Sequence, residues 1–476
     1  MPEQHLLVQK CVGYITKPDI TNAPFEALVN GSQNVLINDA EKVAIRSGYT
    51  LLGAASTATT PIRSDYVWQT SSGTEIALRH YDDELEIYTS TLAAWVRLKN
   101  SLSTTALLQF TTWWSAAEGI DLLLWVDGTD DMYEWSGGIT TLASATANTI
   151  TKSGTNTWKQ DRFLIAGTRK VVIGTTEYTY TGGETTTTLT GVTPDPSGEA
   201  VGANIFQAVR TNTNTPAADF LSSSIRVLNN QIWVRSSKSR VVYVSKNSDF
   251  LAYTFSTPRV SGEGATLTLD NIPNALVRQD KDMWISAGRD DWYKSNFEQI
   301  TVSTTLAEIL TVKKLKTAPE MGAQSQDLVL EIGDFVAFVS YEPALRLLGN
   351  LADIEKPILK ALSNPIKPDF DAADFTNGQL FWNKNRLYIS APNDDKVFIL
   401  ETKESADGAI RRFWQPPQLL PIRRFAIIGG DLHGHSNAAP ETYKLFNGTN
   451  DNDNSFAAYA YYAYRSYDKR DILKTA

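Results

Sequence analysis

The sequence predicts an all-β chain built as a β-propeller of about six to eight blades, with a small β-barrel or sandwich domain inserted between blades. Residues typical of strands, above all Thr, Ser, Val, Trp and Tyr, crowd most of the 476 residues. Short alternating segments return at a spacing of roughly 40 to 50 residues, which is the length of a four-stranded propeller blade. Helix-type periodicity is rare along the chain.

The clearest hairpin of the predicted propeller lies near the start of the chain. Apolar and polar residues alternate in Thr74–His80 and again in Glu84–Tyr88, with Asp82 and Asp83 between the two segments. This alternation predicts two antiparallel strands joined by an Asp-rich turn. A further short strand is expected over Ala94–Leu98.

Units of the same kind follow along the chain. Each has a strand, a turn rich in Asp, Asn or Gly, a second strand that ends in Ser or Trp, and a short outer strand. We predict such units at 121–142, 224–245, 282–294, 327–340, 378–400 and 424–446. The phrases at 229–233 and 383–388 look like one inner-strand element in two blades. Because the repeat is degenerate, a string of unrelated β-meanders stays open as the alternative.

The composition divides the chain into five parts. We predict an N-terminal arm with first strands (1–62), a first part of the propeller (63–146), an inserted Thr/Gly-rich β domain (147–208), a second part of the propeller (209–446) and a closing strand or tail (447–476). The insert is expected because Thr and Gly dominate that stretch, as in Gly182–Gly191. Long excursions from a surface loop cost little closure entropy.

One stretch has helical spacing. Residues 343–362 carry the best helix pattern of the chain, and Pro357 should break it. We therefore expect two short helices there, or one helix and a turn.

Charge and cysteine content exclude several classes of protein. The chain has 44 Lys plus Arg and 53 Asp plus Glu, a net charge of −9, which argues against a broad phosphate-gripping face but not against a surface that nucleic acid slides past. Cys11 is the one cysteine, so an internal disulfide and a cysteine zinc site are excluded. Apolar runs are too short for a membrane helix, and Met1–Lys10 lacks the layout of a signal peptide. We expect a soluble protein made in a reducing compartment.

Paired acidic residues are the first catalytic candidates, since a glycoside hydrolase needs two converging carboxylates. The pairs are Glu84 and Glu86, Asp130 and Asp131, Asp290 and Asp291, and Asp394 and Asp395. Nearly all of them fall at expected hairpin tips, where Asp bonds to its own turn, so turn chemistry is favoured over catalysis. The Ser-x-Asp-x-Gly-x-x-Trp hairpin of sialidase-type propellers is matched neither at 248–250 nor at 286–292.

Metal ligands are the second kind of candidate. His433 and His435 would share one strand face, yet the Gly and Ser-Asn residues around Asp431–His435 predict a mobile loop with no third ligand. Asp451–Ser455 begins like a calcium loop, but Phe456 stands where that loop needs glycine. Phosphate-loop and nucleophile-elbow motifs are also missing. We expect no catalytic residue, no cofactor and no metal.

Short basic clusters and one aromatic pair are the candidate contact residues. The basic residues, candidate subunit contacts or channel-facing groups, are Lys313, Lys314, Lys316, Arg411, Arg412, Arg423 and Arg424. Each cluster adjoins apolar residues, which favours a subunit contact or a solvated face over nucleic-acid binding. Trp113 and Trp114 are adjacent, so in a strand one ring should be exposed unless it is covered. The 12 Trp, 19 Tyr and 18 Phe either fill blade cores or stack on sugars.

Two stretches carry a resemblance to a known family. Ala27–Tyr49 holds an Asn-containing strand, an Asn-Asp turn and Arg46-Ser-Gly-Tyr49. It resembles the opening of bacteriophage tail proteins of the nozzle (tail tubular B-like) and packaged-DNA-stabilisation type, where these features precede a propeller. Tyr443–Asp451, followed by 456–464 and 469–474, is similar to the family's closing pattern of Tyr-Lys-Leu, small turn, Asp, strand and Lys. Such proteins usually continue past that Lys, so we expect a short form or a truncated chain.

The resemblance implies a structural virion protein rather than an enzyme. It implies a ring, expected to be a hexamer, in a short phage tail, made in the bacterial cytoplasm, that conducts and retains the genome. The implied partners are copies of the chain, a portal-side adaptor ring, tail fibres and passing double-stranded DNA without sequence-specific contacts; no membrane-spanning segment is expected. Six copies at −9 sum to roughly −54, and an acidic wall repels DNA. The alternatives are a head-completion plug or other tail joint of the same fold, and a glycan-binding or glycan-cleaving receptor-binding propeller.

Overall fold

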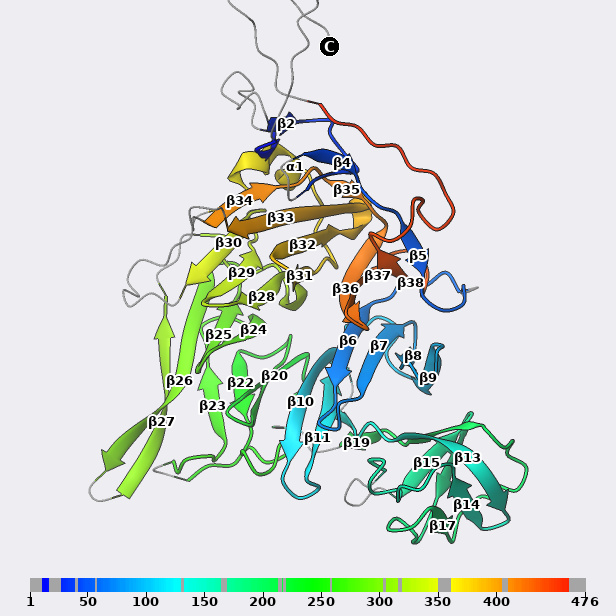
Figure 1. Cartoon of the computed structure of the whole chain (residues 1–476). Coiled ribbons are helices and arrows are strands. Elements are labelled where there is room, and N and C mark those ends of the chain that lie inside the picture. The colour runs from blue at the N-terminus through cyan, green and yellow to red at the C-terminus, as the bar shows by residue number, and fades with distance from the viewer. Residues whose placement is uncertain are drawn as a thin grey trace, which may run out of the picture. The chain divides into compact units, whose positions relative to one another are not determined.

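The computed structural model confirms that the chain is all-β (Figure 1). It describes residues 11–16, 27–38, 42–55, 58–129, 132–163, 169–212, 216, 220–256, 259–302, 305–315, 319–349, 361–404 and 410–461. Within these ranges the one α-helix is α1 (Lys367–Asp371), beside single 3₁₀ turns such as η3 (Asn364–Ile366). No helix of the described residues is long and apolar enough to cross a membrane.

The chain divides into two compact units. Unit 1 contains Met1–Arg63, Gly288–Trp292 and Lys314–Ala476, and unit 2 contains Ser64–Ala287 and Tyr293–Lys313. Each unit is described by itself below.

Unit 2 begins with three four-stranded antiparallel sheets that follow one another along the chain. They are β6 (Ser64–Gln69), β7 (Glu75–Tyr81), β8 (Glu84–Tyr88) and β9 (Val96–Lys99); β10 (Gln109–Ser115), β11 (Ile120–Val126), β12 (Met132–Trp135) and β19 (Arg210–Asn212); and β20 (Ser224–Leu228), β21 (Gln231–Arg235), β22 (Val241–Val244) and β23 (Ala265–Thr268). The hairpin predicted over residues 74–88 is confirmed by β7 and β8. A fourth sheet, most of it in unit 2, joins β24 (Pro273–Gln279), β25 (Asp282–Ala287), β26 (Asp291–Val302) and β27 (Thr305–Lys314).

An inserted domain separates β12 from its sheet neighbour β19. It is one six-stranded sheet in the order β16-β15-β18-β13-β14-β17. Its strands are β13 (Ile139–Thr146), β14 (Thr149–Lys152), β15 (Lys170–Ile173), β16 (Thr176–Thr179), β17 (Thr188–Thr190) and β18 (Asn204–Gln207). The sheet starts at Ile139, before the predicted start at residue 147, and Trp158 and Phe163 fill its core with their rings 4.7 Å apart.

Unit 1 holds three more sheets of consecutive strands. They are β28 (Val329–Ile332), β29 (Phe335–Val339) and β30 (Leu345–Gly349); β31 (Leu380–Asn383), β32 (Arg386–Ala391), β33 (Lys396–Glu404) and β34 (Ile410–Trp414), with β35 (Gln418–Leu419) on β33; and β36 (Ile422–Ile428), β37 (Asp431–Ser436) and β38 (Thr442–Leu445), to which β5 (Tyr49–Leu51) adds. Two small pairs precede them, parallel β1 (Gly13–Ile15) with β2 (Ala27–Val29) and antiparallel β3 (Val35–Ile37) with β4 (Val43–Ile45).

The phrases at 229–233 and 383–388, predicted to be one inner-strand element, occupy the same place in two sheets. Both phrases join the first and second strands of a sheet through two residues of positive φ: Asn229 (54°) and Asn230 (56°), and Lys384 (46°) and Asn385 (65°). Two positive φ values are what a tight hairpin needs to match the twist of its strands.

The helix predicted over residues 343–362 is wrong where the structure describes that stretch. Leu345–Gly349 forms β30, which pairs with β29 from Val339↔Leu345 to Phe335↔Gly349. Most of its side chains are buried, and a strand covered on both faces shows the same run of apolar residues as a buried helix. Residues 350–360, with Pro357, lie outside the described residues.

The mobile loop predicted around Asp431–His435 is also corrected. These residues form β37, which is paired on both sides, with β36 and with β38. Only Gly429 (φ 60°) and Gly430 (φ 81°) make the turn, so the glycines marked a tight hairpin rather than a long loop.

Candidate functional site

Two segments that are far apart in the sequence meet in one place, which we name the closing joint (residues 46–52 and 442–452). Strand β5 lies antiparallel to β38, with the pairs Tyr49↔Leu445, Thr50↔Lys444 and Leu51↔Tyr443. A segment from the first part of the chain thus supplies the fourth strand of the last sheet (Figure 1). Both sides of the joint belong to unit 1.

The joint is held by a buried ion pair. The Arg46 side chain is fully buried, and its guanidinium binds both carboxylate oxygens of Asp451, with Nη1 2.6 Å from Oδ1. Its Nε donates to Asn34 Oδ1 (3.2 Å), and Nη2 also donates to the Leu419 carbonyl (3.3 Å). The ring centre of Phe456 lies 3.9 Å from the guanidinium carbon. A charge that is buried, paired and hydrogen-bonded in this way fixes geometry strongly.

Glycine is required beside this ion pair. A Cβ on Gly48 would lie 1.9 Å from the carbonyl oxygen of Asn450, which is backbone and cannot swing away. The close approach lets Gly48 N–H donate to the Gly448 carbonyl (3.0 Å) and Tyr49 N–H to the Asn450 carbonyl (3.1 Å). The rings of Tyr49 and Tyr443 pack with centroids 4.7 Å apart.

The two stretches that carry the family resemblance therefore form one structural feature. Arg46-Ser-Gly-Tyr49 supplies the guanidinium and the glycine, and Tyr443–Asp451 supplies the partner strand and the carboxylate. Sequence reasoning treated them as separate opening and closing patterns and did not pair Arg46 with Asp451. The sequence offered only a weak signal for this pairing. Arg46 and Asp451 are 405 residues apart, and each lies close to a glycine in a turn.

The candidate catalytic carboxylates lie on hairpins and are engaged with their neighbours. Glu86 pairs with Arg79 at 2.7 Å, and Glu84 pairs with Arg97 at 3.0 Å. Tyr81 donates its hydroxyl to Glu84, and burial together with that carboxylate raises the pKa of Tyr81. These contacts make the Glu84/Glu86 hairpin a network of ion pairs.

The other acidic candidates bind turn backbone or a neighbouring side chain. Asp290 accepts the backbone N–H of Glu320, Asp291 pairs with Lys314 at 3.1 Å, Asp394 accepts the backbone N–H of Asp374, and Asp395 accepts the Asn437 amide. Asp130 and Asp131 lie outside the described residues.

The two histidines are buried on one face of β37. His433 Nδ1 lies 3.0 Å from the Asp431 carbonyl, and His435 Nδ1 lies 2.9 Å from Thr442 Oγ1. Among the residues that the structure describes, no group of three or more His, Cys, Asp or Glu side chains is placed to hold a metal ion. In place of a calcium loop, Asp451 is the carboxylate of the closing joint.

The candidate contact residues divide into exposed and buried groups. Lys313 and Lys314 are exposed on β27, and Arg412 is exposed on β34. Lys316 lies outside the described residues, as does the side chain of Arg411. Trp114 is 47% exposed, whereas Trp113 is buried and donates Nε1–H to the Asn230 carbonyl at 2.9 Å. Fully buried tryptophans fill cores at Trp68, Trp125, Trp135, Trp158, Trp233 and Trp292.

Arg423 and Arg424 lie in the interior rather than on a solvated face. Their burial is a correction to the exposed position expected for this pair, and it follows from a β-bulge: the register of β36 on β37 shifts between Ile422 and Arg424, so Arg423 is the extra residue. A bulge re-aims side chains that strict alternation would send to opposite faces. Arg424 pairs with Asp327 at 2.7 Å.

Among the residues that the structure describes, Arg423 forms no ion pair of this kind. Its Nε is buried without a hydrogen-bond partner, as is the Nε of Arg63. Burial lowers the pKa of Arg423 to about 10, and the positive charges of Arg424 and Arg63 add to this effect. The negative charge of Asp327 raises the pKa and so acts in the opposite direction. We name Arg63, Arg423, Arg424 and Asp327 the arginine cluster; all four belong to unit 1.

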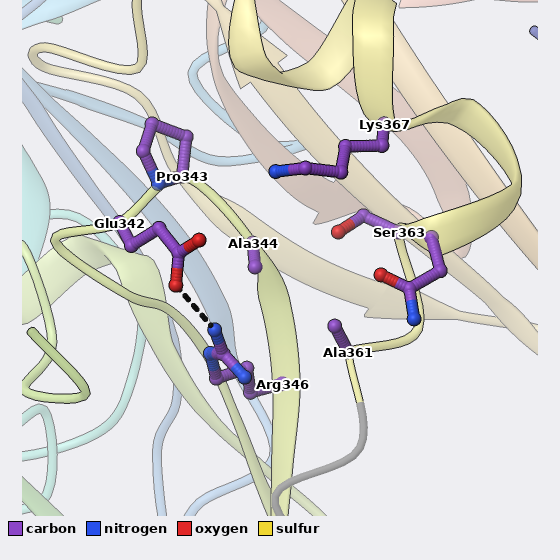
Figure 2. A pocket seen from close by; sticks show the side chains of 8 residues that line it. Glu342, Pro343, Ala344, Arg346, Ala361, Ser363 and Lys367 are labelled. Carbon is purple, nitrogen blue, oxygen red and sulfur yellow. Dashed lines mark hydrogen bonds and ion pairs between the residues drawn. The ribbon is translucent and has the colours of Figure 1, made fainter. Parts of the chain in front are cut away.

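Unit 1 also contains a polar pocket of about 390 Å³ (Figure 2). Glu342 and Arg346 line one side, where they pair at 3.1 Å, and Ser363 and Lys367 lie opposite them. Lys367 pairs with Asp371 at 2.8 Å, and Ser363 Oγ accepts the Leu345 N–H. The pocket's charged side chains are thus engaged in ion pairs within the chain.

Comparison with known proteins does not assign a family. No protein-family model matches the chain, and no curated protein matches it. Among solved structures, it is similar to BBS1N in complex with ARL6DN (TM-score 0.41, 10% identity, 86% of this chain and 100% of that one) and to the computationally designed Ika8 protein (TM-score 0.38, 10% identity, 83% and 99%). Hsv2 of Kluyveromyces lactis gives a TM-score of 0.29 at 10% identity over 76% and 100%. These TM-scores are too low to assign the fold.

Proposed function

We propose that this chain is a structural virion protein, a ring-forming nozzle component of a short phage tail that conducts and retains the DNA genome and anchors neighbouring tail parts. The observation that carries the proposal is the closing joint, because the two stretches that resemble the nozzle family pack against each other there. A buried joint between residues 405 positions apart stiffens unit 1, as a structural part of a virion requires.

The proposal includes a propeller of seven blades. It is supported by seven successive sheets in the described residues, which begin with β6, β10, β20, β24, β28, β31 and β36. In this arrangement β5 closes the ring of blades by completing the last one, and radial repetition leaves only short strand edges open.

Exposed basic residues supply the contacts between neighbouring subunits of the proposed ring. In a ring, each subunit presents a different surface to the neighbour on either side. We assign Lys313, Lys314 and Arg412, which are exposed, to contacts with acidic surfaces of neighbouring subunits or tail parts. The net charge of −9 per chain keeps passing DNA from sticking to the wall. The protein acts as a conduit and joint, not as a catalyst.

Imaging of the purified chain tests this proposal. Negative-stain images are taken of the chain alone and after mixing with tail adaptor complexes. Closed rings with a central hole, in either sample, are the expected result. Single particles in both samples, with no ring and no attachment, would contradict it. Gold-labelled antibodies on intact virions separate a nozzle from a head-completion plug or another tail joint of the same fold.

A second candidate is a glycan-binding or glycan-cleaving propeller, which the exposure of Trp114 (47%) favours. Aromatic faces that reach solvent can stack on sugar rings. Incubation with capsular or cell-wall glycans, followed by an assay for reducing ends and for binding, tests this reading. It predicts that Trp114→Ala lowers binding, whereas the nozzle proposal predicts neither binding nor release of sugars.

A further inference from the structure

The polar pocket of unit 1 has the size and the fixed walls of a small-molecule site (Figure 2). Its volume of about 390 Å³ lies within the range of ligand pockets, roughly 300–1,000 Å³. One wall comes from residues 342–346, at the turn between β29 and β30, and the other from residues 361–367, which include η3. Backbone hydrogen bonds join the two walls: Leu345 N–H donates to Ser363 Oγ (3.2 Å), and Leu362 N–H donates to the Leu345 carbonyl (2.8 Å). The pocket is therefore formed before any ligand enters.

The first wall carries a cation that is held in place. The Arg346 side chain is 8% exposed and pairs with Glu342 at 3.1 Å, and its Nε donates to Ser340 Oγ at 3.0 Å. The Glu342 side chain is 53% exposed, so water screens its charge more than it screens the charge of the buried guanidinium. The electrostatic potential inside the pocket therefore favours an anion.

The opposite wall carries two groups that can donate to such an anion. Figure 2 shows the Lys367 side chain directed into the pocket. Its pair with Asp371 spans one helical turn, and the two side chains are 51% and 40% exposed, so the pair contributes little and its ammonium can turn to a ligand. Ser363 Oγ accepts the Leu345 N–H, and the same hydroxyl can donate its hydrogen to a ligand.

We propose that this pocket binds a small carboxylate-bearing molecule, with one carboxylate held by Lys367 Nζ and Ser363 Oγ. Hydrogen bonds between an ammonium or a hydroxyl and a carboxylate are charge-assisted and strong. Ala344 and Ala361 also line the pocket, and their methyl groups pack against the methylene carbons of the ligand. The inference goes beyond the proposed tail function and does not depend on it.

Saturation-transfer NMR of the full chain with succinate, at constant ionic strength, tests the proposal. The methylene protons of succinate report binding, and a titration gives the Kd. We expect saturable transfer with succinate and none with succinamide, which has the same carbon skeleton without the charges. Lys367→Met should weaken binding about tenfold, as the loss of a hydrogen bond to a charged group does. Asp371→Asn should strengthen binding, because it removes the carboxylate that competes for Lys367.

Lys170→Met is the matched control. Lys170 pairs with Glu177, and their side chains are 46% and 48% exposed, so the variant removes the same charge from the same kind of pair. It should bind succinate as the wild type does. Because Lys367 is half-exposed, its substitution leaves the fold intact, which circular dichroism checks. The proposal is overturned by the absence of saturable transfer in the wild type, or by equal affinities of Lys367→Met and Lys170→Met.

Discussion

Gly48 shows how one residue can fix the path of the backbone. Its Cβ position is taken by the carbonyl oxygen of Asn450, 1.9 Å away. We predict that Gly48→Ala lowers the free energy of opening the closing joint by about 3 kcal/mol, the upper end of what overpacking costs, because the clash is with backbone. Hydrogen exchange of the β38 amides measures this free energy.

Gly198→Ala is the matched control for this variant. A Cβ at Gly198 meets no atom within 4 Å. We expect a change within about 0.5 kcal/mol there, as for surface substitutions in general. Equal effects of the two substitutions would show that Gly48 has no special place in the joint.

Glu263 gives the residue-scale prediction for pH. It accepts hydrogen bonds from the Ser256 side chain (2.6 Å), the Ser256 N–H (2.8 Å) and the Val260 N–H (3.0 Å), which lower its pKa from 4.5 to about 2. Because the folded-state pKa is depressed, the stabilisation is complete above pH 4.5 and disappears as the pH falls to about 2.

The stability difference between wild type and Glu263→Gln should therefore shrink over that pH range. Urea unfolding at a series of pH values measures it, with Glu331→Gln, on the exposed side of β28, as the control for removing a surface charge. A difference that stays constant from pH 7 to pH 2 would contradict the role given to these hydrogen bonds.

At the scale of elements, the Arg46–Asp451 pair joins β5 to the turn after β38. The Arg46 side chain is fully buried, and the Asp451 side chain is 12% exposed. We predict that Arg46→Met costs about 3–5 kcal/mol, because it leaves a buried carboxylate without its partner. The matched control is Arg97→Met, which breaks the half-exposed pair with Glu84 and should cost less than about 1 kcal/mol.

A double substitution separates the ion pair from side-chain packing. Arg46→Met combined with Asp451→Asn should recover part of the loss, since no charge is then left buried. If urea unfolding gives equal costs for Arg46→Met and Arg97→Met, the pair does not hold the joint.

The same elements show what the sequence can and cannot predict. Alternation located hairpins such as β7–β8, because a half-buried strand has period two. The alternation pattern failed at Leu345–Gly349, because a strand that is buried on both faces shows no alternation. It also could not place Arg423, because the β-bulge there shifts the alternation by one residue. The closing joint was missed because no local pattern pairs residues 405 positions apart.

At the scale of the whole molecule, assembly should depend on exposed basic residues. We predict that Lys313→Glu with Arg412→Glu abolishes ring formation and leaves the fold intact, because both side chains lie on the surface. Lys238→Glu with Arg240→Glu makes the same charge change at other exposed positions and should leave rings intact. Negative-stain images show whether each double variant still forms rings, and circular dichroism checks that each variant is folded. Loss of rings in both double variants would show an effect of net charge alone.

The central claim is that β5 completes the last sheet of unit 1 and so joins residues 46–52 to residues 442–452. Native-state hydrogen exchange tests it most directly at three amides: those of Gly48, Tyr49 and Leu52 donate to the carbonyls of Gly448, Asn450 and Thr442. We predict that these amides exchange as slowly as those of the β37–β38 pairing, because they open only when the whole sheet opens. Fast exchange at all three, with slow exchange in β37 and β38, would show that β5 is not the closing strand.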